Sequence, residues 1–511
     1  MKKGLNWKRV LTRIGIAIGI LIGLTIVFVT AFVVVLGPKV SVTTQADTVL
    51  APEMVPPGIE TTVAFVNVNV IPMDSDRLLE GQIVIIKNGS IAEMGSGSSV
   101  DIPVDALKVD GQGKFLMPGL SDMHVHLFNS ENDLLLYLAN GVTTIRDVGG
   151  PPIRLQWRDE ISAGTRPGPN LLVRSPLIQQ LNWFNGITYT WASSGGIRTA
   201  NTPEEAEKLV AEFKAQGYDG IKAPHGIFNS MDVYRIILAS ARKHGLPIDG
   251  HAPIPLSYGK DKTRCWNEFR NLGVEAVAHT EELIKIVDWS DKSIRKTARD
   301  VADDGLWVTT TIALIQSILT QRYNLEDELA KMPEVKYVNP AILKRGVAWL
   351  DIKDGWVPGL NKYEADPDSS KEEVLEGISS YIQALGKMFV ALHEEGALLM
   401  SGTDTNVPLM VPGFSLHNEL EAMVDLGISP YDALRTSTYN PALYLNSLNE
   451  FGTIEAGKRA DLVLLQANPL EDITNTRLIE GVMVRGRWYT RADLDTMLDK
   501  IAEANQEVSE E

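Results

Sequence analysis

Cysteine, histidine and positive charge are all scarce in this chain of 511 residues. The single cysteine, Cys265, permits no internal disulfide, so we expect a structural thiol rather than a disulfide framework. The 48 Lys and Arg residues are outnumbered by 65 Asp and Glu residues, and six of the basic residues lie within residues 1–40, which contain no acid. The rest of the chain is therefore strongly acidic. Because nucleic acid is bound by basic surfaces, this composition excludes nucleic acid as the expected partner.

A long uncharged run near the amino end predicts a membrane location. Residues 14–36 are 23 positions without a charge, which is long enough to cross a bilayer. Five basic residues precede the run and only Lys39 follows closely, so the amino end should stay cytoplasmic. A cleaved secretory signal is the alternative, but the run is long for one and lacks an Ala-x-Ala site behind it. We expect a cytoplasmic stub and transmembrane anchor (1–37) and a proline-bearing linker (38–58), with the remainder on the exported, periplasmic or extracellular, side.

Short apolar or small-residue runs repeatedly end in groups that bind metals. His124 and His126 end such a run after Pro118-Gly119, and positions i and i+2 of a strand face the same side. A lone His-x-His is often no more than two polar residues at a strand end. Further groups at the ends of such runs favour a metal site, because imidazole and carboxylate are common ligands: His251, His279, Lys222 and Asp404.

Helix-like segments precede several of these runs. Residues 202–216 lie before Lys222, and residues 231–244 lie before His251. Such alternation is typical of a parallel sheet covered by helices. In a closed eight-stranded sheet the functional groups gather at the C-terminal ends of the strands, so groups far apart in the sequence can converge.

The order His-x-His, Lys, His, His, Asp resembles the amidohydrolase superfamily, specifically its imidazolonepropionase-like and Xaa-Pro dipeptidase-like branch. The resemblance covers roughly residues 60–490 and is strongest over residues 115–126, 141–150, 401–445 and 452–469. It implies an α/β fold in which a (β/α)8 TIM barrel (117–449) interrupts a small β-sandwich domain built from both flanks (59–116 and 450–490). Residues 491–511 are expected to form an acidic C-terminal helix or tail.

The resemblance also implies a binuclear metal site. In it, His124, His126 and Asp404 hold one divalent metal ion, and His251 and His279 hold the second. Lys222, N6-carboxylated by carbon dioxide, bridges both ions, with zinc as the default metal. An ordinary lysine with a buried stem is the alternative for Lys222. A hydroxide shared by the two ions attacks the substrate, and Asp404 serves as general acid and base.

Three further residues are weaker candidates for the site. His225 and His417 could contact the substrate, although each could equally belong to a loop or helix without a function. Arg146 could form an ion pair with Asp147 that supports the metal ligands, or an ordinary loop pair. About 80 residues separate the seventh and eighth strands, and this insertion could serve as a lid, a structural element or a docking site.

The sequence thus predicts a membrane-anchored, metal-dependent amidohydrolase that cleaves a C–N bond in an amide, peptide-like or cyclic amide substrate. Hydrolysis of a lactone or ester by the same site is the alternative, and deamination is disfavoured because deaminase relatives commonly use one metal without the bridging lysine. A non-catalytic membrane-tethered binding or scaffold protein is the alternative of another class. A homo-oligomer is compatible with all of these.

Overall fold

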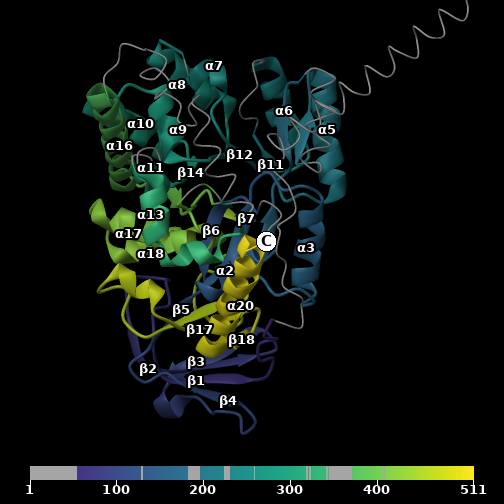
Figure 1. Cartoon of the computed structure of the whole chain (residues 1–511), viewed down its shortest axis with the longest axis vertical. Helices are drawn as coiled ribbons and strands as arrows, with labels where there is room; N and C mark the ends of the chain where they lie inside the picture. The colour runs from purple at the N-terminus through teal and green to yellow at the C-terminus, as the bar shows by residue number, and fades with distance from the viewer. Residues whose placement is uncertain are drawn as a thin grey trace, which may run out of the picture.

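Eight parallel strands form a closed barrel at the centre of the molecule (Figure 1). Three of them pair in the order β6-β7-β8, and five pair in the order β11-β12-β13-β14-β15. Two isolated parallel bridges, Arg174 with Gly220 and Val125 with Thr405, join the edges of the two sheets. The strands are β6 (Leu120–Val125), β7 (Val142–Asp147), β8 (Asn170–Val173), β11 (Ile221–Lys222), β12 (Ile248–Gly250), β13 (Ala276–Val277), β14 (Trp307–Thr309) and β15 (Leu398–Met400).

The structure is a computed structural model that describes part of the chain. The described residues are 55–510, apart from 128–130, 182–195, 224–230, 258, 318–319, 321–323, 341–342, 344–370, 406 and 408. The predicted anchor and most of the predicted linker therefore lie outside the described residues. Within the described part, no helix combines the length and the apolar character that a membrane span requires.

Helices surround the barrel, and local sequence signals set their ends. The helix expected over residues 202–216 is α5: Thr202 accepts from the backbone of Glu205 in a capping box, and Gly217 ends the helix at φ 87°. The helix expected before His251 is α6. The helices around the barrel are α2 (Asp133–Ala139), α3 (Ile153–Ser162), α5 (Pro203–Gln216), α6 (Met231–Lys243), α7 (Ile254–Ser257), α8 (Lys262–Leu272), α9 (Thr280–Ile286), α10 (Asp291–Asp303), α11 (Ile312–Gln316), α16 (Lys371–Glu394), α17 (Phe414–Asp425), α18 (Pro430–Thr436) and α19 (Tyr439–Tyr444).

Strands from the two flanks of the barrel combine in one small domain. Its strands follow a single hydrogen-bonded path, β18-β17-β16-β5-β1-β2-β3, with β4 beside β1, rather than two separate sheets. In Figure 1 the purple strands lie at the lower end together with the yellow strands from the other end of the chain. The strands are β1 (Val63–Val70), β2 (Leu79–Lys87), β3 (Ser90–Ser96), β4 (Leu107–Asp110), β5 (Phe115–Pro118), β16 (Leu462–Leu465), β17 (Ile479–Val484) and β18 (Arg487–Thr490).

The boundary between the two domains differs slightly from the prediction. Met117 and Pro118 pair with β16 of the small domain, so the barrel begins at Leu120 and not at Met117. Gly119 separates the two strands, and a Cβ at this position would lie 2.1 Å from Oγ1 of Thr143. A side chain there would collide with β7, so the chain can cross from sheet to barrel here only at a glycine.

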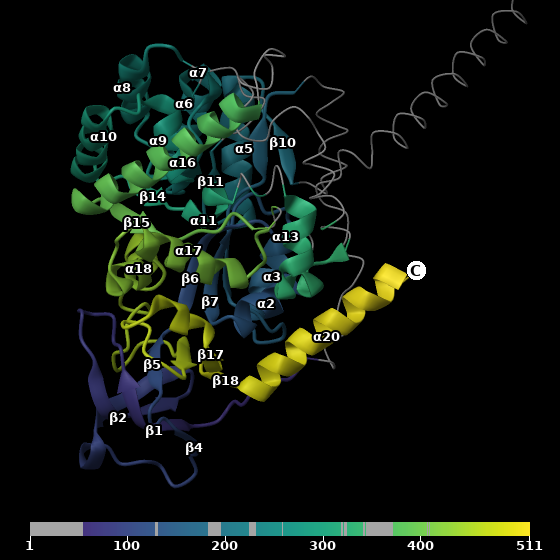
Figure 2. The same cartoon turned by 60° about the vertical axis from the view of Figure 1, so that its left-hand side comes forward.

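The end of the chain crosses from the small domain to the barrel. Helix α20 (Arg491–Glu510) packs on α2 and on η3 (Pro333–Tyr337), a 3-10 segment that follows α13 (Leu325–Lys331) in the predicted insertion (Figure 2). Asn505 donates from Nδ2 to the carbonyl oxygens of Lys336 and Val338. Part of the predicted insertion is helix α16, which packs against α9 and α10. The lid prediction otherwise falls largely on residues 344–370, outside the described residues.

Candidate metal centre

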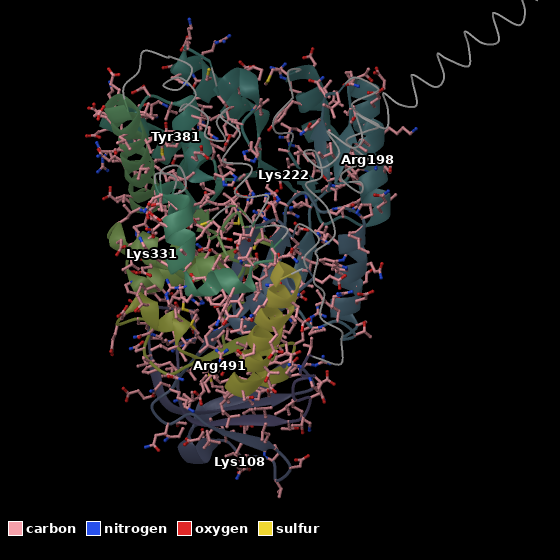
Figure 3. All side chains as sticks on the ribbon, viewed as in Figure 1. Lys108, Arg198, Lys222, Lys331, Tyr381 and Arg491 are labelled. Atoms are coloured by element: carbon pink, nitrogen blue, oxygen red, sulfur yellow. The ribbon has the colours of Figure 1, made fainter. Side chains whose placement is uncertain are left out.

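Six predicted site residues lie at the carboxyl ends of barrel strands. His124 is within β6 and His126 follows it; Lys222 ends β11; His251 follows β12 and His279 follows β13; Asp404 comes after β15. Because the strands are parallel, their carboxyl ends meet on one face of the barrel. Figure 3 labels Lys222 in the upper half of the molecule, far from Lys108 in the small domain at the lower end. The six residues therefore come from strand ends on the same face of the barrel.

Asp404 joins the groups from the first strand. Its Oδ1 lies 3.1 Å from Nε2 of His126 and 3.4 Å from Nε2 of His124, and these three residues offer ligand atoms within 4.8 Å of one another. Its Oδ2 lies 4.0 Å from Nε2 of His279. Burial raises the pKa of this carboxyl group, but the hydrogen bond from His126 and the neighbouring positive charges outweigh burial and lower it. Asp404 is therefore an anion placed among imidazole rings.

The other two histidines complete the cluster of rings. The ring centroids of His124 and His279 are 4.4 Å apart, and those of His251 and His279 are 4.9 Å apart. Nδ1 of His251 lies 3.1 Å from Oε1 of Glu282, and Nδ1 of His279 lies 3.1 Å from Oγ1 of Thr311. Burial lowers the pKa of His279 to about 3 and also lowers that of His124, so both rings are neutral. Neutral imidazoles whose Nδ1 atoms are engaged present Nε2 as a metal ligand.

Lys222 completes the group of six. Its side chain is 3% exposed, and its Nζ lies 3.4 Å from Nε2 of His124. Burial lowers the pKa of the Lys222 amine to about 8. The amine therefore has an accessible neutral form, which is the form that reacts with carbon dioxide. The backbone N–H of Lys222 donates to Oγ of Ser175, which fixes the end of the strand.

Asp122, which is not among the predicted site residues, fixes the loop that carries Asp404. Its oxygens accept from the backbone N–H of His124 (3.3 Å), the backbone N–H of Thr403 (3.1 Å) and Oγ1 of Thr403 (2.6 Å). Burial raises its pKa to about 7. The same alternation that aligned His124 with His126 puts Asp122 on that side, so the sequence contained the signal. At Gly402 a Cβ would lie 2.7 Å from Cβ of His124, so this close approach requires glycine.

Arg146 supports the site, but not through the predicted pair with Asp147. Neighbouring strand residues face opposite sides, so Asp147 pairs with Arg154 (3.2 Å) and Arg146 pairs with Asp249 (2.9 Å). Asp249 also binds Arg174 at 2.6 Å, and Arg146 donates to the carbonyl oxygen of Met123 at 2.6 Å. These buried charges lie one layer below the ligands, since Asp249 precedes His251 by two residues along the strand.

The two predicted substrate contacts have different outcomes. His225 lies outside the described residues. His417 points to another part of the molecule: its Nδ1 lies 2.9 Å from Oγ1 of Thr476 in η4 (Ile473–Arg477), at the contact of α17 with the C-terminal flank. Helix α17 begins after Gly413, and Ser415 lies within its first turn, where its Oγ accepts from the backbone N–H of Val411.

His417 makes the stability of the fold sensitive to acid. Burial, with a smaller effect from Arg477, lowers its pKa from 6.5 to about 3. Its contribution to the free energy of unfolding is therefore present above pH 6.5 and is lost as the pH falls toward 3, with a slope of up to about 1.4 kcal/mol per pH unit. We expect His417→Gln to remove this component from chemical unfolding curves measured between pH 6.5 and 4. An unchanged pH slope would show that His417 is not buried in its neutral form.

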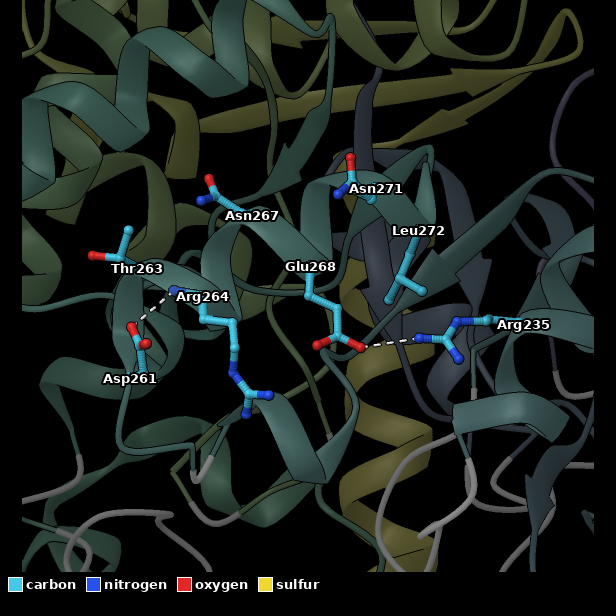
Figure 4. Close-up of a pocket in the computed structure, with 8 residues that line it drawn as sticks. All are labelled: Arg235, Asp261, Thr263, Arg264, Asn267, Glu268, Asn271 and Leu272. Atoms are coloured by element: carbon cyan, nitrogen blue, oxygen red, sulfur yellow. Dashed lines mark hydrogen bonds and ion pairs between the residues drawn. The ribbon is translucent and has the colours of Figure 1, made fainter.

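A surface pocket elsewhere on the barrel is distinct from this centre. It has a volume of about 600 Å³ and lies between α6 and α8, where Arg235 bonds to Glu268 and the backbone N–H of Arg264 donates to Asp261 (Figure 4). Its lining comes from the outer helices rather than from the strand ends. It contains none of the six clustered groups, so we assign the chemistry to the strand ends and not to this pocket.

Known proteins resemble this chain over most of its length. An adenine deaminase from Ruegeria sp. (strain TM1040) is 19% identical over 414 residues, covering 80% of this chain and 54% of that protein. An imidazolonepropionase from Shouchella clausii (strain KSM-K16) is 22% identical over 386 residues, covering 70% of this chain and 72% of that protein. The chain spans about half the length of the adenine deaminases that it matches.

A solved structure supports the fold. The crystal structure of a Xaa-Pro dipeptidase with bound methionine in the active site matches with a TM-score of 0.59 at 18% identity, covering 84% of this chain and all of that one. The sequence model described as "Amidohydrolase family" matches residues 115–489, which span the barrel and the second part of the small domain. Since this match covers well over half of the sequence, the chain belongs to the amidohydrolase family.

Proposed function

We propose that this protein is a metal-dependent hydrolase that cleaves a C–N bond in a small amide, peptide-like or cyclic amide substrate. One observation carries the proposal: four imidazoles, one carboxylate and one lysine amine converge at the carboxyl ends of the barrel strands. The family assignment supports it. Two divalent cations, with zinc as the default, would lower the pKa of a water molecule and polarise the substrate carbonyl group.

The residues present fit two such ions. His124, His126 and Asp404 would hold the first, because three of their ligand atoms lie within 4.8 Å of one another. His251 and His279 would hold the second through Nε2, because Glu282 and Thr311 engage their Nδ1 atoms. Lys222, N6-carboxylated, would bridge them. An ammonium group at this position would repel both ions, whereas a carbamate supplies two anionic oxygens.

Asp404 is suited to move the proton during the reaction. Its two oxygens face different histidines, with Oδ1 beside His126 and Oδ2 toward His279. It therefore stands between the two halves of the site. From there it would accept a proton from the attacking water and donate it to the leaving nitrogen. Asp122 and Thr403 hold its loop, so the carboxylate has little freedom to turn away.

The class of substrate rests on the names of the relatives. They include an imidazolonepropionase and a Xaa-Pro dipeptidase, together with adenine deaminases. Among these we favour amide or peptide-like hydrolysis, because the bridging lysine is commonly absent from deaminases. Lactone or ester hydrolysis uses the same polarised carbonyl and remains the alternative. We further propose that residues 14–36 anchor the protein in a membrane with the barrel on the exported side.

Metal analysis and a substrate screen test the proposal together. Purified full-length protein is loaded with zinc or manganese, its metal content is measured, and hydrolysis is screened across dipeptides, N-acyl amino acids, cyclic amides and lactones. We expect roughly two equivalents of metal per chain and turnover of an amide class. Turnover restricted to lactones would select the alternative reaction. Failure to bind metal after metal-replete expression would support the scaffold function instead.

A matched pair of histidine variants distinguishes the loss of a metal ligand from a general loss of stability. His251→Ala should remove one equivalent of metal and most of the activity. His393→Ala is the control, because His393 lies in the last turn of α16 with a half-exposed side chain near Asp432. It should keep both metals and full activity. Equal losses from the two variants would indicate general destabilisation rather than loss of a ligand.

A further inference from the structure

Glu419 on helix α17 is fully buried without a basic partner among its hydrogen bonds. Its Oε1 accepts from Oγ1 of Thr310 (2.5 Å) and from the backbone N–H of Ile312 (2.8 Å), and its Oε2 accepts from the backbone N–H of Ala313 (2.8 Å). Burying a carboxylate is costly unless its hydrogen bonds compensate. Thr310 follows β14, and Ile312 and Ala313 are the first residues of α11, so this one side chain holds both ends of the connection between the two elements.

The donors to Glu419 come from both sides of Thr311, a residue with an unfavourable backbone. Thr311 has φ 52° and ψ 41°, in the left-handed region that β-branched residues avoid. Such a conformation persists only where surrounding contacts enforce it, and such residues cluster at functional sites. Glu419 holds Thr310 on one side and Ile312 and Ala313 on the other. It therefore supplies the contacts that keep Thr311 in this conformation.

The hydroxyl of Thr311 determines which nitrogen of His279 carries the proton. Oγ1 of Thr311 donates to the carbonyl oxygen of Thr310 at 2.8 Å, which uses its single hydrogen. At 3.1 Å from Nδ1 of His279, the same oxygen can then only accept. The proton of the neutral ring is consequently on Nδ1. Nε2, which faces Asp404, keeps its lone pair for a ligand.

We propose that Glu419 is a positioning residue for the second metal ion: it holds Thr311 in the left-handed conformation that keeps the His279 proton on Nδ1 and Nε2 free. The inference rests on the proposed function, in which His279 binds that ion. The two histidines of the second ion are thus oriented in different ways. Glu282 contacts His251 directly, whereas Glu419 acts on His279 through a strained turn.

Single and double variants of the full-length protein test this pathway. We expect Glu419→Gln and Thr311→Val each to weaken binding of the second zinc ion by about 10–100-fold, measured by competition with a chelator. Thr311→Ser, which keeps the hydroxyl, should bind zinc like the wild type. If Glu419 acts through Thr311, the double variant should be no weaker than either single variant, because the effects do not add within one pathway. Additive losses would overturn the proposal.

A measurement without metal distinguishes this inference from the proposed function. In metal-free protein labelled with ¹⁵N-histidine, the His279 signal, assigned by its loss in His279→Gln, should report the Nδ1–H form. Glu419→Gln and Thr311→Val should each reduce that form, and an unchanged tautomer in both would refute the inference. Zinc binding by the wild type tests the proposed function separately. Glu421→Gln is the control, because Glu421 lies on the same helix but bonds to Arg477 at the surface.

The same set of variants also shows whether an effect comes from a general loss of protein stability. If Glu419→Gln fails to fold, the Thr311→Val and Thr311→Ser pair still decides the link between the hydroxyl and His279. A wild-type tautomer and wild-type zinc affinity in Thr311→Val would then overturn the proposal. Thermal unfolding of each metal-free variant identifies any general loss of stability. A lower midpoint with an unchanged tautomer would assign Glu419 to the fold alone.

Discussion

Replacing Lys222 by alanine is expected to reduce activity by roughly 10³-fold or more, because several kcal/mol of metal-derived transition-state stabilisation depend on the bridge. The side chain is buried, and its Nζ lies 3.4 Å from Nε2 of His124, one of the proposed ligands of the first metal ion. The variant should also lose the second metal ion. Activity assays and metal analysis of the same preparation check both effects.

Chemical rescue makes the Lys222 prediction specific to the carbamate. The space left by the side chain should admit a short carboxylic acid, so formate, acetate or propionate should restore part of the activity and of the bound metal. Lys243→Ala is the matched control, because Lys243 is exposed and pairs with Glu207 on the helical surface. Full activity in Lys222→Ala without any added acid would remove the carbamate from the mechanism.

The fold could be predicted largely because each barrel strand is a short apolar run with a polar group at its end. Such a run can be recognised in the sequence because both faces of a strand in a parallel sheet are buried. The ends of elements were harder to predict. The run over residues 307–314 continues past β14 into α11, and nothing in its composition marks the change at Thr311. Residues 430–444 likewise form two helices, with a break at Ser437 and Thr438.

The candidate ligands could be named from the sequence, whereas most of the residues that orient them could not. A histidine or aspartate at the end of a buried strand is seldom needed for the fold, so its type and position indicate a functional site. Asp122, Glu282 and Glu419 act through hydrogen bonds to partners on other elements, and Glu419 reaches across more than 100 positions to Ile312. Contacts of this kind depend on tertiary structure. Arg146 shows the same limit, since its neighbour Asp147 was the nearest acid in sequence and Asp249 is the partner in space.

The replacement Asp404→Asn is expected to lower kcat by about 10²–10⁴-fold while the first metal ion stays bound. Asparagine keeps the size of the side chain and an oxygen that can ligate, but it cannot accept the proton from water. Asp404 has φ 55°, and asparagine tolerates this left-handed conformation better than most residues, so the loop should keep its shape. Asp472→Asn, in an exposed turn that caps η4, controls for loss of an aspartate elsewhere. Because binding precedes proton transfer, KM should change little. A kcat within tenfold of the wild type would instead show that another group accepts the proton from water. Asp404 would then be a metal ligand only.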